Sequence, residues 1–218
     1  MSTDNMRELR RLGYETTRPD VQRLVPHNAQ RILDLGCASG ALGAALKARQ
    51  GAEVVGIELL EDYAAEAAEQ LDRVICADLN SGLAADDLGT FDCVIAADVL
   101  EHLVEPWVTL EAAAARLRPG GTIVISLPNV QYLRTFRELL RGTWPRDDVG
   151  PFDRTHLRWF TVRDARALLT DVGATEIAVD WQYFFTGSAL RVARGLGERA
   201  APFLAGQMVL AGRFPGSA

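Results

Sequence analysis

Residues 31–43 read RILDLGCASGALG. The apolar run 32–35 has the character of a buried strand, and a turn of small residues, 36–40, separates it from a helical pattern that starts at Ala41. Glycines in such a turn allow unusual φ/ψ angles and let a ligand approach the backbone closely. This strand–turn–helix unit predicts a nucleotide-like cofactor at the turn.

The kind of cofactor follows from how this turn departs from the dinucleotide pattern G-x-G-x-x-G. Counted from Gly36, the two later glycine positions hold Ala38 and Ala41, so a diphosphate would fit poorly. The carboxylate of Asp34, two residues before Gly36, would repel phosphate and attract a cationic sulfonium or amino group. The pattern therefore favours S-adenosylmethionine over NAD. At this turn we expect the cofactor to contact Asp34, Gly36, Cys37 and Gly40.

A second carboxylate lies at the end of the next predicted strand, residues 53–57. Glu58 follows Gly36 by twenty-two positions, which is typical of the acidic residue that binds ribose hydroxyls in nucleotide-binding βαβ units. A carboxylate can accept hydrogen bonds from both vicinal hydroxyls at once. We therefore expect Glu58 to bind the ribose and Leu59 to lie against the adenine.

The third and fourth predicted strands end in carboxylates as well. Residues 73–76 form a short strand, and we expect Asp78 beyond it to accept a hydrogen bond from the adenine amine. The stretch 91–103 contains the apolar run 93–97, typical of a strand buried on both faces, and Asp98 follows it. These strand ends are expected to contact the cofactor through Asp78, Leu79, Ala97 and Asp98.

Five strands alternate with helices along the chain, the fifth being residues 122–127 after a Pro-Gly-Gly turn. Right-handed crossovers make such an alternation a parallel, doubly wound α/β sheet. Ligands bind at the carboxyl edge of such a sheet, where the strand order reverses. The sequence therefore predicts that Gly36, Glu58, Asp78 and Asp98 converge on one cleft.

Composition limits the classes of partner. A length of 218 residues suits one α/β domain with an appendage, and the net charge of −6 argues against a dedicated nucleic-acid-binding protein. No segment approaches 18 uncharged apolar residues, so we expect no membrane partner. The three cysteines lack metal-type spacing and are expected to be reduced, which favours the cytoplasm. Nothing in the sequence fixes the oligomeric state.

The Asp-x-Gly turn, the placement of Glu58 and the Pro-Gly-Gly fifth strand together resemble the class I S-adenosylmethionine-dependent methyltransferases. The stretch FDRTHLRWFT, residues 152–161, is similar to small bacterial members that often accompany glycosyltransferases. The resemblance implies a Rossmann-like, mostly parallel seven-stranded sheet, completed by strands near 176–179 and 207–213. It also implies methyl transfer from S-adenosylmethionine without fixing the acceptor, for which we favour a hydroxyl group of a small molecule. An N-methyltransferase, an RNA-ribose methyltransferase and a non-catalytic cofactor-binding protein remain alternatives.

The resemblance also divides the chain. Residues 1–30 are expected to form an N-terminal cap segment, and residues 31–218 the methyltransferase domain, with a substrate-covering insertion at about 128–160. In similar proteins a Tyr and an Arg-Pro pair precede the first motif, which implies that Tyr14 and Arg18 reach the methionine carboxylate of the cofactor. The insertion region is rich in arginine, and this keeps RNA or a nucleotide-linked sugar open as an acceptor.

Candidate catalytic groups follow the fourth strand. Asp98, Glu101 and His102 stand at i, i+3 and i+4, so a helix that began there would place them on one face at the cleft. His156, from the insertion, could join them. Their expected role is to position and deprotonate the acceptor, with a histidine as general base.

A metal site is the alternative role for the same residues. Ubiquinone-pathway O-methyltransferases and small-RNA 2′-O-methyltransferases carry Glu-x-x-Glu-His, where the cluster binds a divalent metal. The resemblance implies a site for Mg²⁺, Mn²⁺, Fe²⁺ or Zn²⁺ with the ligands Asp98, Glu101, His102 and His156. The first ligand is Asp98 here, one methylene shorter than the glutamate of that pattern. A purely structural role is also open, with Glu101 and His102 capping the helix and His156 packed beside Trp159 and Phe160.

Overall fold

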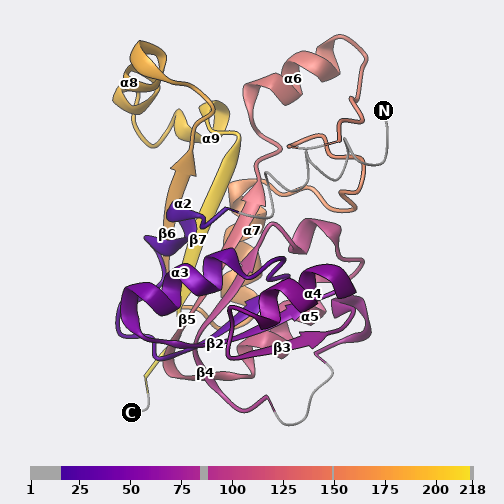
Figure 1. Ribbon diagram of the computed structural model, residues 1–218. Helices are drawn as coiled ribbons and strands as arrows, with labels where there is room; N and C mark the ends of the chain where they lie inside the picture. Colours follow the sequence, from indigo (N-terminus) through magenta and orange to yellow (C-terminus); the bar gives the residue numbers. More distant parts are fainter. Residues whose placement is uncertain (1–15, 84–87, 149, 217–218) are drawn as a thin grey trace.

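The computed structural model describes residues 16–83, 88–148 and 150–216 (Figure 1). Its centre is a seven-stranded sheet with the strand order β3-β2-β1-β4-β5-β7-β6. The strands are β1 (Arg31–Leu35), β2 (Glu53–Glu58), β3 (Arg73–Cys76), β4 (Phe91–Ala97), β5 (Leu117–Pro128), β6 (Glu176–Gln182) and β7 (Gln207–Arg213). Strands β1 to β5 pair in parallel, whereas β7 runs antiparallel to both β5 and β6. The mostly parallel, doubly wound sheet is the one predicted.

Helices cover both faces of this sheet. The α-helices are α2 (Pro19–Gln22), α3 (Ala41–Gln50), α4 (Glu61–Ala68), α5 (Pro106–Ala114), α6 (Leu133–Leu140), α7 (Val162–Asp171), α8 (Gly187–Gly195) and α9 (Ala201–Leu204), and two 3₁₀ turns are η1 (Leu79–Ser81) and η2 (Leu100–His102). Among the residues that the structure describes, no helix combines the length and the apolar character that a membrane crossing needs.

The apolar core has two layers, one on each side of the sheet. Successive residues of β1 belong to different layers: Ile32 packs with Leu46 and Val54, and Leu33 packs with Val94 and Ile125. A strand buried on both faces reads as a continuous apolar run, which explains the pattern of β1 and β4. Since β1 pairs with both β2 and β4, the strand order reverses beside it and a crevice opens at its carboxyl end.

One local prediction is wrong. The chain after β4 does not form a helix through residues 98–102, because Asp98 has a left-handed φ of 58° and only the short turn η2 follows. The next helix, α5, begins at Pro106, where the missing N–H of proline costs no helical hydrogen bond. Asp98, Glu101 and His102 therefore do not share a helical face.

The segment after β5 leaves the sheet and returns to it. It forms α6 and a long loop, and Asn129 then bridges to Phe160 just before α7 starts. In Figure 1, α6 stands beyond the carboxyl end of β5, while α8 and α9 stand beyond the neighbouring strands β6 and β7. These two projections flank the edge of the sheet at which ligands are expected.

Candidate functional site

A cavity of about 500 Å³ lies at the carboxyl edge of the sheet. The described residues that we expect to bind the cofactor or to act in catalysis all line this cavity, except Gly40. Tyr14, assigned to the cofactor as well, lies outside the described residues. The convergence of residues from four strand ends is thus present in the structure.

Gly40 has a different environment. It precedes α3 with a φ of 85°, and a Cβ at this position would lie 3.1 Å from the Cα of Ala67 on α4. The left-handed φ and the close approach of α4 both account for a glycine here. Its contact with a cofactor stays a prediction.

The turn after β1 presents its backbone to the cavity. The N–H groups of Gly36 and Cys37 both donate to the carbonyl of Ile57 on β2, at 2.8 and 3.0 Å. Gly36 has a φ of 69°, and a Cβ there would come within 2.9 Å of the Val99 side chain. The turn therefore needs glycine at this position for both conformation and space.

Glu58 is fixed against this turn. One carboxylate oxygen accepts from the N–H of Ala38 at 2.9 Å, and the other accepts from the N–H of Leu60 at 2.9 Å. Each carboxylate oxygen can accept a second hydrogen bond, so both stay available to vicinal hydroxyl groups. Leu59 lines the cavity beside it with a side chain that is 57% exposed. This geometry fits a ribose at Glu58 and an adenine at Leu59.

Asp34 is a buried carboxylate on the cavity wall that is only 2% exposed. Its Oδ2 atom has no hydrogen-bond partner among the described residues. Burial, together with the negative charge of Glu58 and against the influence of Arg18, raises the pKa of Asp34 to about 7. A cationic group in the cavity would give this carboxylate the partner it lacks, so the site fits the charged end of S-adenosylmethionine.

Asp78 lines the same cavity beyond β3. Its carboxylate accepts hydrogen bonds from the backbone N–H and the side-chain amide of Asn80, at 2.8 and 3.0 Å, and so caps η1. These contacts fix the carboxylate, and its hydrogen bond to the adenine amine stays a prediction. Leu79 and Ala97 also line the cavity, as expected.

Arg18 and Asp98 form a partly buried ion pair on the cavity wall. The Arg18 guanidinium also donates to Asp20 and to Ser126, at 2.8 Å each, while Gln207 donates to the same Asp98 carboxylate. Although burial opposes the charge of Arg18, Asp98 and Asp20 raise its pKa above the usual value. The Asp98 carboxylate therefore faces donors from the N-terminal segment, β5 and β7.

Ser126 and Gln207 were not predicted as site residues. Ser126 lies within β5 and Gln207 is the first residue of β7, and the antiparallel pairing of these strands brings them together. The signal in the sequence is weak, because a single polar residue in an apolar strand carries no motif. A serine in the middle of the run IVISLP is the one local indication.

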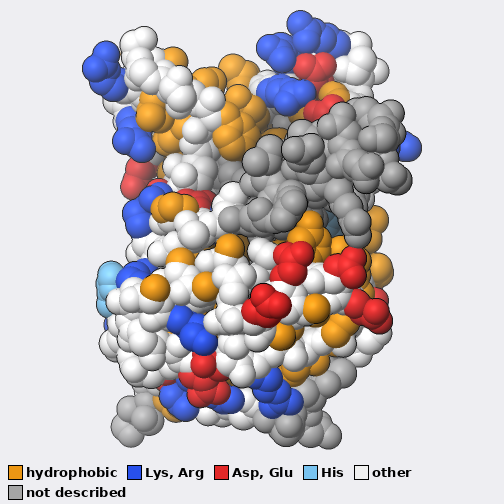
Figure 2. All heavy atoms as spheres, viewed as in Figure 1, with side chains coloured by type: hydrophobic (Ala, Val, Ile, Leu, Met, Phe, Trp, Pro, Cys, Tyr) orange, Lys and Arg blue, Asp and Glu red, His pale blue; other side chains and the backbone are white. Residues whose placement is uncertain are grey.

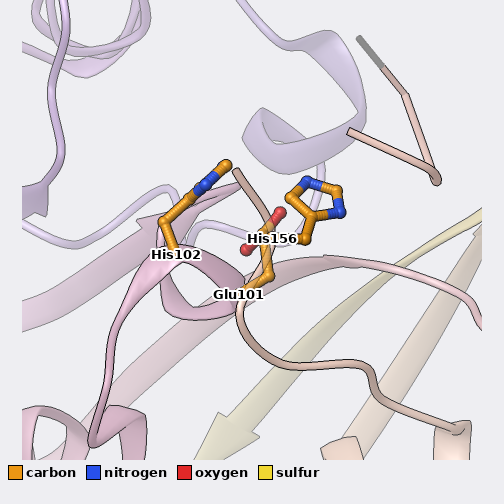
Figure 3. A group of neighbouring side chains, drawn as sticks. All are labelled: Glu101, His102 and His156. Atoms are coloured by element: carbon orange, nitrogen blue, oxygen red, sulfur yellow. The ribbon is translucent and has the colours of Figure 1, made fainter. Parts of the chain in front are cut away.

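Glu101, His102 and His156 gather on the other side of the cavity (Figure 3). Each offers one potential ligand atom, and these atoms lie within 4.8 Å of one another. The two imidazole rings meet edge to face, with their centroids 4.8 Å apart. Three of the four residues expected to act together are thus grouped, whereas the Asp98 carboxylate is engaged with Arg18.

The backbone explains how His156 reaches this place. The N–H groups of Leu157 and Arg158 both donate to the carbonyl of Glu101, at 2.8 and 3.1 Å. His102 is held by the hydroxyl of Thr155, which lies 3.1 Å from its Nδ1 atom. The loop before α7 is therefore tied to η2 next to both histidines.

Burial shifts the pKa values of Glu101 and His156. Burial, reinforced by the charge of Asp98, raises the pKa of Glu101 well above its usual value. Burial and the neighbouring His102 lower the pKa of His156. Two buried atoms, Oε2 of Glu101 and Nδ1 of His156, have no hydrogen-bond partner among the described residues. Unpartnered polar atoms on a cavity wall indicate a place for a ligand.

Comparisons with known proteins show the family of the chain. A family model described as a methyltransferase domain matches residues 6–179. The ubiquinone biosynthesis O-methyltransferase of Xanthomonas campestris pv. campestris is 37% identical over 107 residues, which are 45% of this chain and 43% of that protein. The enzyme of the same name from Xylella fastidiosa is 34% identical over 116 residues, covering 50% of this chain and 46% of that protein. The chain thus matches less than half the length of these relatives.

Solved structures share the fold. A possible histamine N-methyltransferase from Thermotoga maritima superimposes with a TM-score of 0.69 at 18% identity, over 97% of this chain and 95% of that one. A SAM-dependent methyltransferase from Archaeoglobus fulgidus gives 0.67 at 17% identity, over 94% and 98%. The chain belongs to the methyltransferase-domain family, within the class I S-adenosylmethionine-dependent methyltransferases.

Proposed function

We propose that the protein transfers a methyl group from S-adenosylmethionine to a hydroxyl group of an uncharged small molecule. The observation that carries this proposal is the group of Glu101, His102 and His156 on the wall of the cavity that also holds Asp34 and Glu58. The cofactor supplies a methyl group that is already activated. The protein then has to align the acceptor and remove its proton.

The cofactor end of the cavity is assigned to four side chains. Asp34 faces the cationic end of the cofactor, Glu58 accepts from the ribose hydroxyls, and Asp78 accepts from the adenine amine. Arg18 lines the same cavity, and its guanidinium, which also donates to Asp98, Asp20 and Ser126, is assigned to the methionine carboxylate. The unpartnered oxygen of Asp34 and the fixed carboxylate of Glu58 support this arrangement.

The acceptor end is assigned to the two histidines. A neutral His156 can accept a proton, and its lowered pKa keeps it neutral near pH 7. In this role Glu101 orients the histidines rather than taking the proton, because burial favours its neutral form. The Xanthomonas and Xylella relatives are named as O-methyltransferases, which supports O-methylation. The Thermotoga protein is described as a possible histamine N-methyltransferase, which keeps N-methylation as an alternative.

The charges around the cavity favour an uncharged acceptor. Asp148 and Asp153 line the acceptor end, and among the described residues Arg18 is the one arginine or lysine on the cavity wall. Arginines of the insertion pair with acidic side chains outside the cavity, as in Arg134 with Asp147, or with the acidic rim, as in Arg154 with Asp148. A phosphate or an RNA backbone would find little positive charge at this site.

A divalent cation at the acceptor end is a second candidate, favoured by the potential ligand atoms of Glu101, His102 and His156 within 4.8 Å. The donor set of one carboxylate and two imidazoles fits Mn²⁺, Fe²⁺ or Zn²⁺ better than Mg²⁺. The cation would lower the pKa of a bound hydroxyl group. Asp98, the expected fourth ligand, already binds Arg18, so this version has three protein ligands.

The proposal also places the protein in the cytoplasm of a bacterium, and the three free thiols agree with this location.

The test has two steps. Calorimetry should detect binding of S-adenosylhomocysteine, and a labelled methyl donor should then report turnover on neutral polyols, phenols, amines and a short RNA. We expect turnover on a hydroxylated acceptor. Transfer to amines alone would replace the proposal by N-methylation, and tight cofactor binding without transfer to any acceptor would favour the non-catalytic alternative. Turnover that a chelator removes and Mn²⁺ restores would select the metal version.

A further inference from the structure

Two projections above the carboxyl edge carry exposed apolar side chains. We define the apolar crest as Phe136, Leu139 and Leu140 of α6 together with Val192, Leu196 and Phe203 of the α8–α9 region. Leu140 is 90% exposed, and the other five are between 43% and 63% exposed. Single exposed leucines are ordinary on a protein surface, but a group of this size marks a contact site.

The two parts of the crest meet at one pair of aromatic rings, and a second aromatic pair lies beside it. The ring centroids of Phe136 and Phe203 are 6.3 Å apart, and those of Tyr132 and Phe184 are 6.0 Å apart. These aromatic contacts join α6 to α9 and to the segment after β6. Figure 2 shows hydrophobic atoms gathered between the two projections at the top of the view, with Lys and Arg side chains around them.

The charge around the crest is opposite to the charge of the whole protein. The chain has a net charge of −6, yet the segments that carry the crest contain Arg137 in α6, Arg141 directly after it, and Arg191 and Arg194 in α8. Arg137 and Arg141 share a single carboxylate, that of Glu138, and their side chains are 58% and 59% exposed. Apolar side chains rimmed by arginines are typical of a surface that lies on an anionic membrane.

We propose that the apolar crest is a docking surface for a membrane that contains anionic lipids. The leucines and phenylalanines would enter the boundary between headgroups and acyl chains, and the arginines would contact the lipid phosphates. A second copy of this chain is a poorer occupant, because a twofold interface here would bring arginine rims of the same charge together. The proposal concerns contact with one face of a bilayer, so it revises the expectation of no membrane partner without requiring a spanning helix.

The apolar crest lies on the same side of the molecule as the cavity. Both projections follow the carboxyl ends of β5 and β6, the same edge at which the cavity lies (Figure 1). Docking would therefore bring the edge of the sheet that carries the cavity toward the lipid surface. The binding itself does not depend on methyl transfer, so the two proposals can fail separately.

The experiment is flotation of the full chain with vesicles of phosphatidylcholine alone and of phosphatidylcholine mixed with phosphatidylglycerol. We expect binding to the mixed vesicles, weakened by salt because charges at a surface are screened. Replacing two arginines in Arg137→Gln/Arg141→Gln should weaken that binding by about thirtyfold. Leu139→Ser/Leu140→Ser should weaken it as well, while the control Val108→Ser, an exposed position on α5, should not.

Each other outcome overturns the proposal. Equal binding to both kinds of vesicle, or to neither, would remove the anionic membrane as the occupant. Self-association in sedimentation that Leu139→Ser/Leu140→Ser abolishes would assign the crest to a second copy. Binding of S-adenosylhomocysteine by all variants serves as the check that they are folded, since the substituted residues do not line the cavity.

Discussion

Arg18 and Asp98 form an ion pair on the cavity wall although they lie eighty positions apart in the chain. Arg18 immediately precedes the short helix α2, and its φ of 46° is left-handed, a conformation that is unusual for a residue before proline. The ion pair, the contact with Ser126 and the contact with Asp20 together hold it there. A strained backbone kept in place by partly buried charges points to a role in the site rather than in packing alone.

Replacing Arg18 by Gln should weaken binding of the amino-acid end of the cofactor and leave binding of the adenosine end unchanged. We expect Arg18→Gln to reduce the affinity for S-adenosylhomocysteine about tenfold or more, because a charge-assisted hydrogen bond to the carboxylate is lost. Affinity for 5′-methylthioadenosine, which lacks the amino-acid group, should stay nearly the same. Calorimetry with both ligands makes the measurement, and Arg23→Gln is the control, since Arg23 pairs with Asp180 in a more exposed position. Equal losses for both ligands would assign Arg18 a structural role.

Glu58 is the predicted ribose ligand, and Glu58→Gln tests it. The substitution keeps the size of the side chain and removes the charge, so binding of both S-adenosylhomocysteine and 5′-methylthioadenosine should weaken about tenfold or more. Glu61→Gln, an exposed position in the first turn of α4, should leave both affinities unchanged. The ribose assignment does not survive if the Glu58 variant binds as tightly as the parent.

Strand-end carboxylates could be predicted because their signals are local. Asp34 and Glu58 each lie at the end of a short apolar run at a fixed distance from the glycine turn, and the parallel sheet brings such ends together. Ser126 and Gln207 could not be predicted in the same way. Their contact depends on the antiparallel register of β5 and β7, which joins segments about eighty residues apart.

The grouping of Glu101, His102 and His156 was predicted on partly wrong grounds. The i, i+3, i+4 spacing brings side chains together only in a helix, here one that starts at Asp98. The left-handed φ of Asp98 turns the chain after β4 away from a helical path. His102 and His156 meet because two backbone N–H groups of the insertion donate to the carbonyl of Glu101. Contacts of this kind between a loop and a 3₁₀ turn have no periodic pattern in the sequence.

Asp34 should make the stability of the ligand-free protein depend on pH. Its pKa is about 7 in the folded protein and about 3.8 without the influence of the fold, so between these values the folded state holds a proton that the unfolded state releases. The free energy of unfolding therefore falls as pH rises through this window, by about 1.4 kcal/mol for each unit of pKa difference. At pH values below about 3.8 the contribution of Asp34 to the free energy of unfolding is fully present.

Asp34→Asn is the matched variant, because the amide has the same shape and does not titrate. Urea denaturation at pH values across the window should give a smaller decrease for Asp34→Asn than for the parent protein. The same variant should bind S-adenosylhomocysteine more weakly at pH 8, where the parent carboxylate is charged and available to the amino group. Parallel stability curves for the two proteins would contradict the burial of Asp34 as the source of the pH dependence.

The last prediction concerns His102 and His156, whose rings lie edge to face at the proposed acceptor end of the cavity. Residues that perform one step together lose activity non-additively. With an acceptor identified, His102→Ala, His156→Ala and the double variant should all reduce kcat to a similar floor. Cofactor affinity should change little, since neither imidazole is assigned to the cofactor. His27→Ala, at an exposed position, is the control and should keep full activity.

The same variants distinguish the base from the metal, because a general base and a ligand set respond differently to a chelator. If a histidine removes the proton unaided, treatment with a chelator leaves the parent kcat unchanged. If the group holds a divalent cation, the parent loses activity and regains it with Mn²⁺, and each single variant binds Mn²⁺ more weakly in calorimetry. Losses that simply add in the double variant would mean that the two histidines act independently, and a His156→Ala variant that loses only stability would make His156 a packing residue.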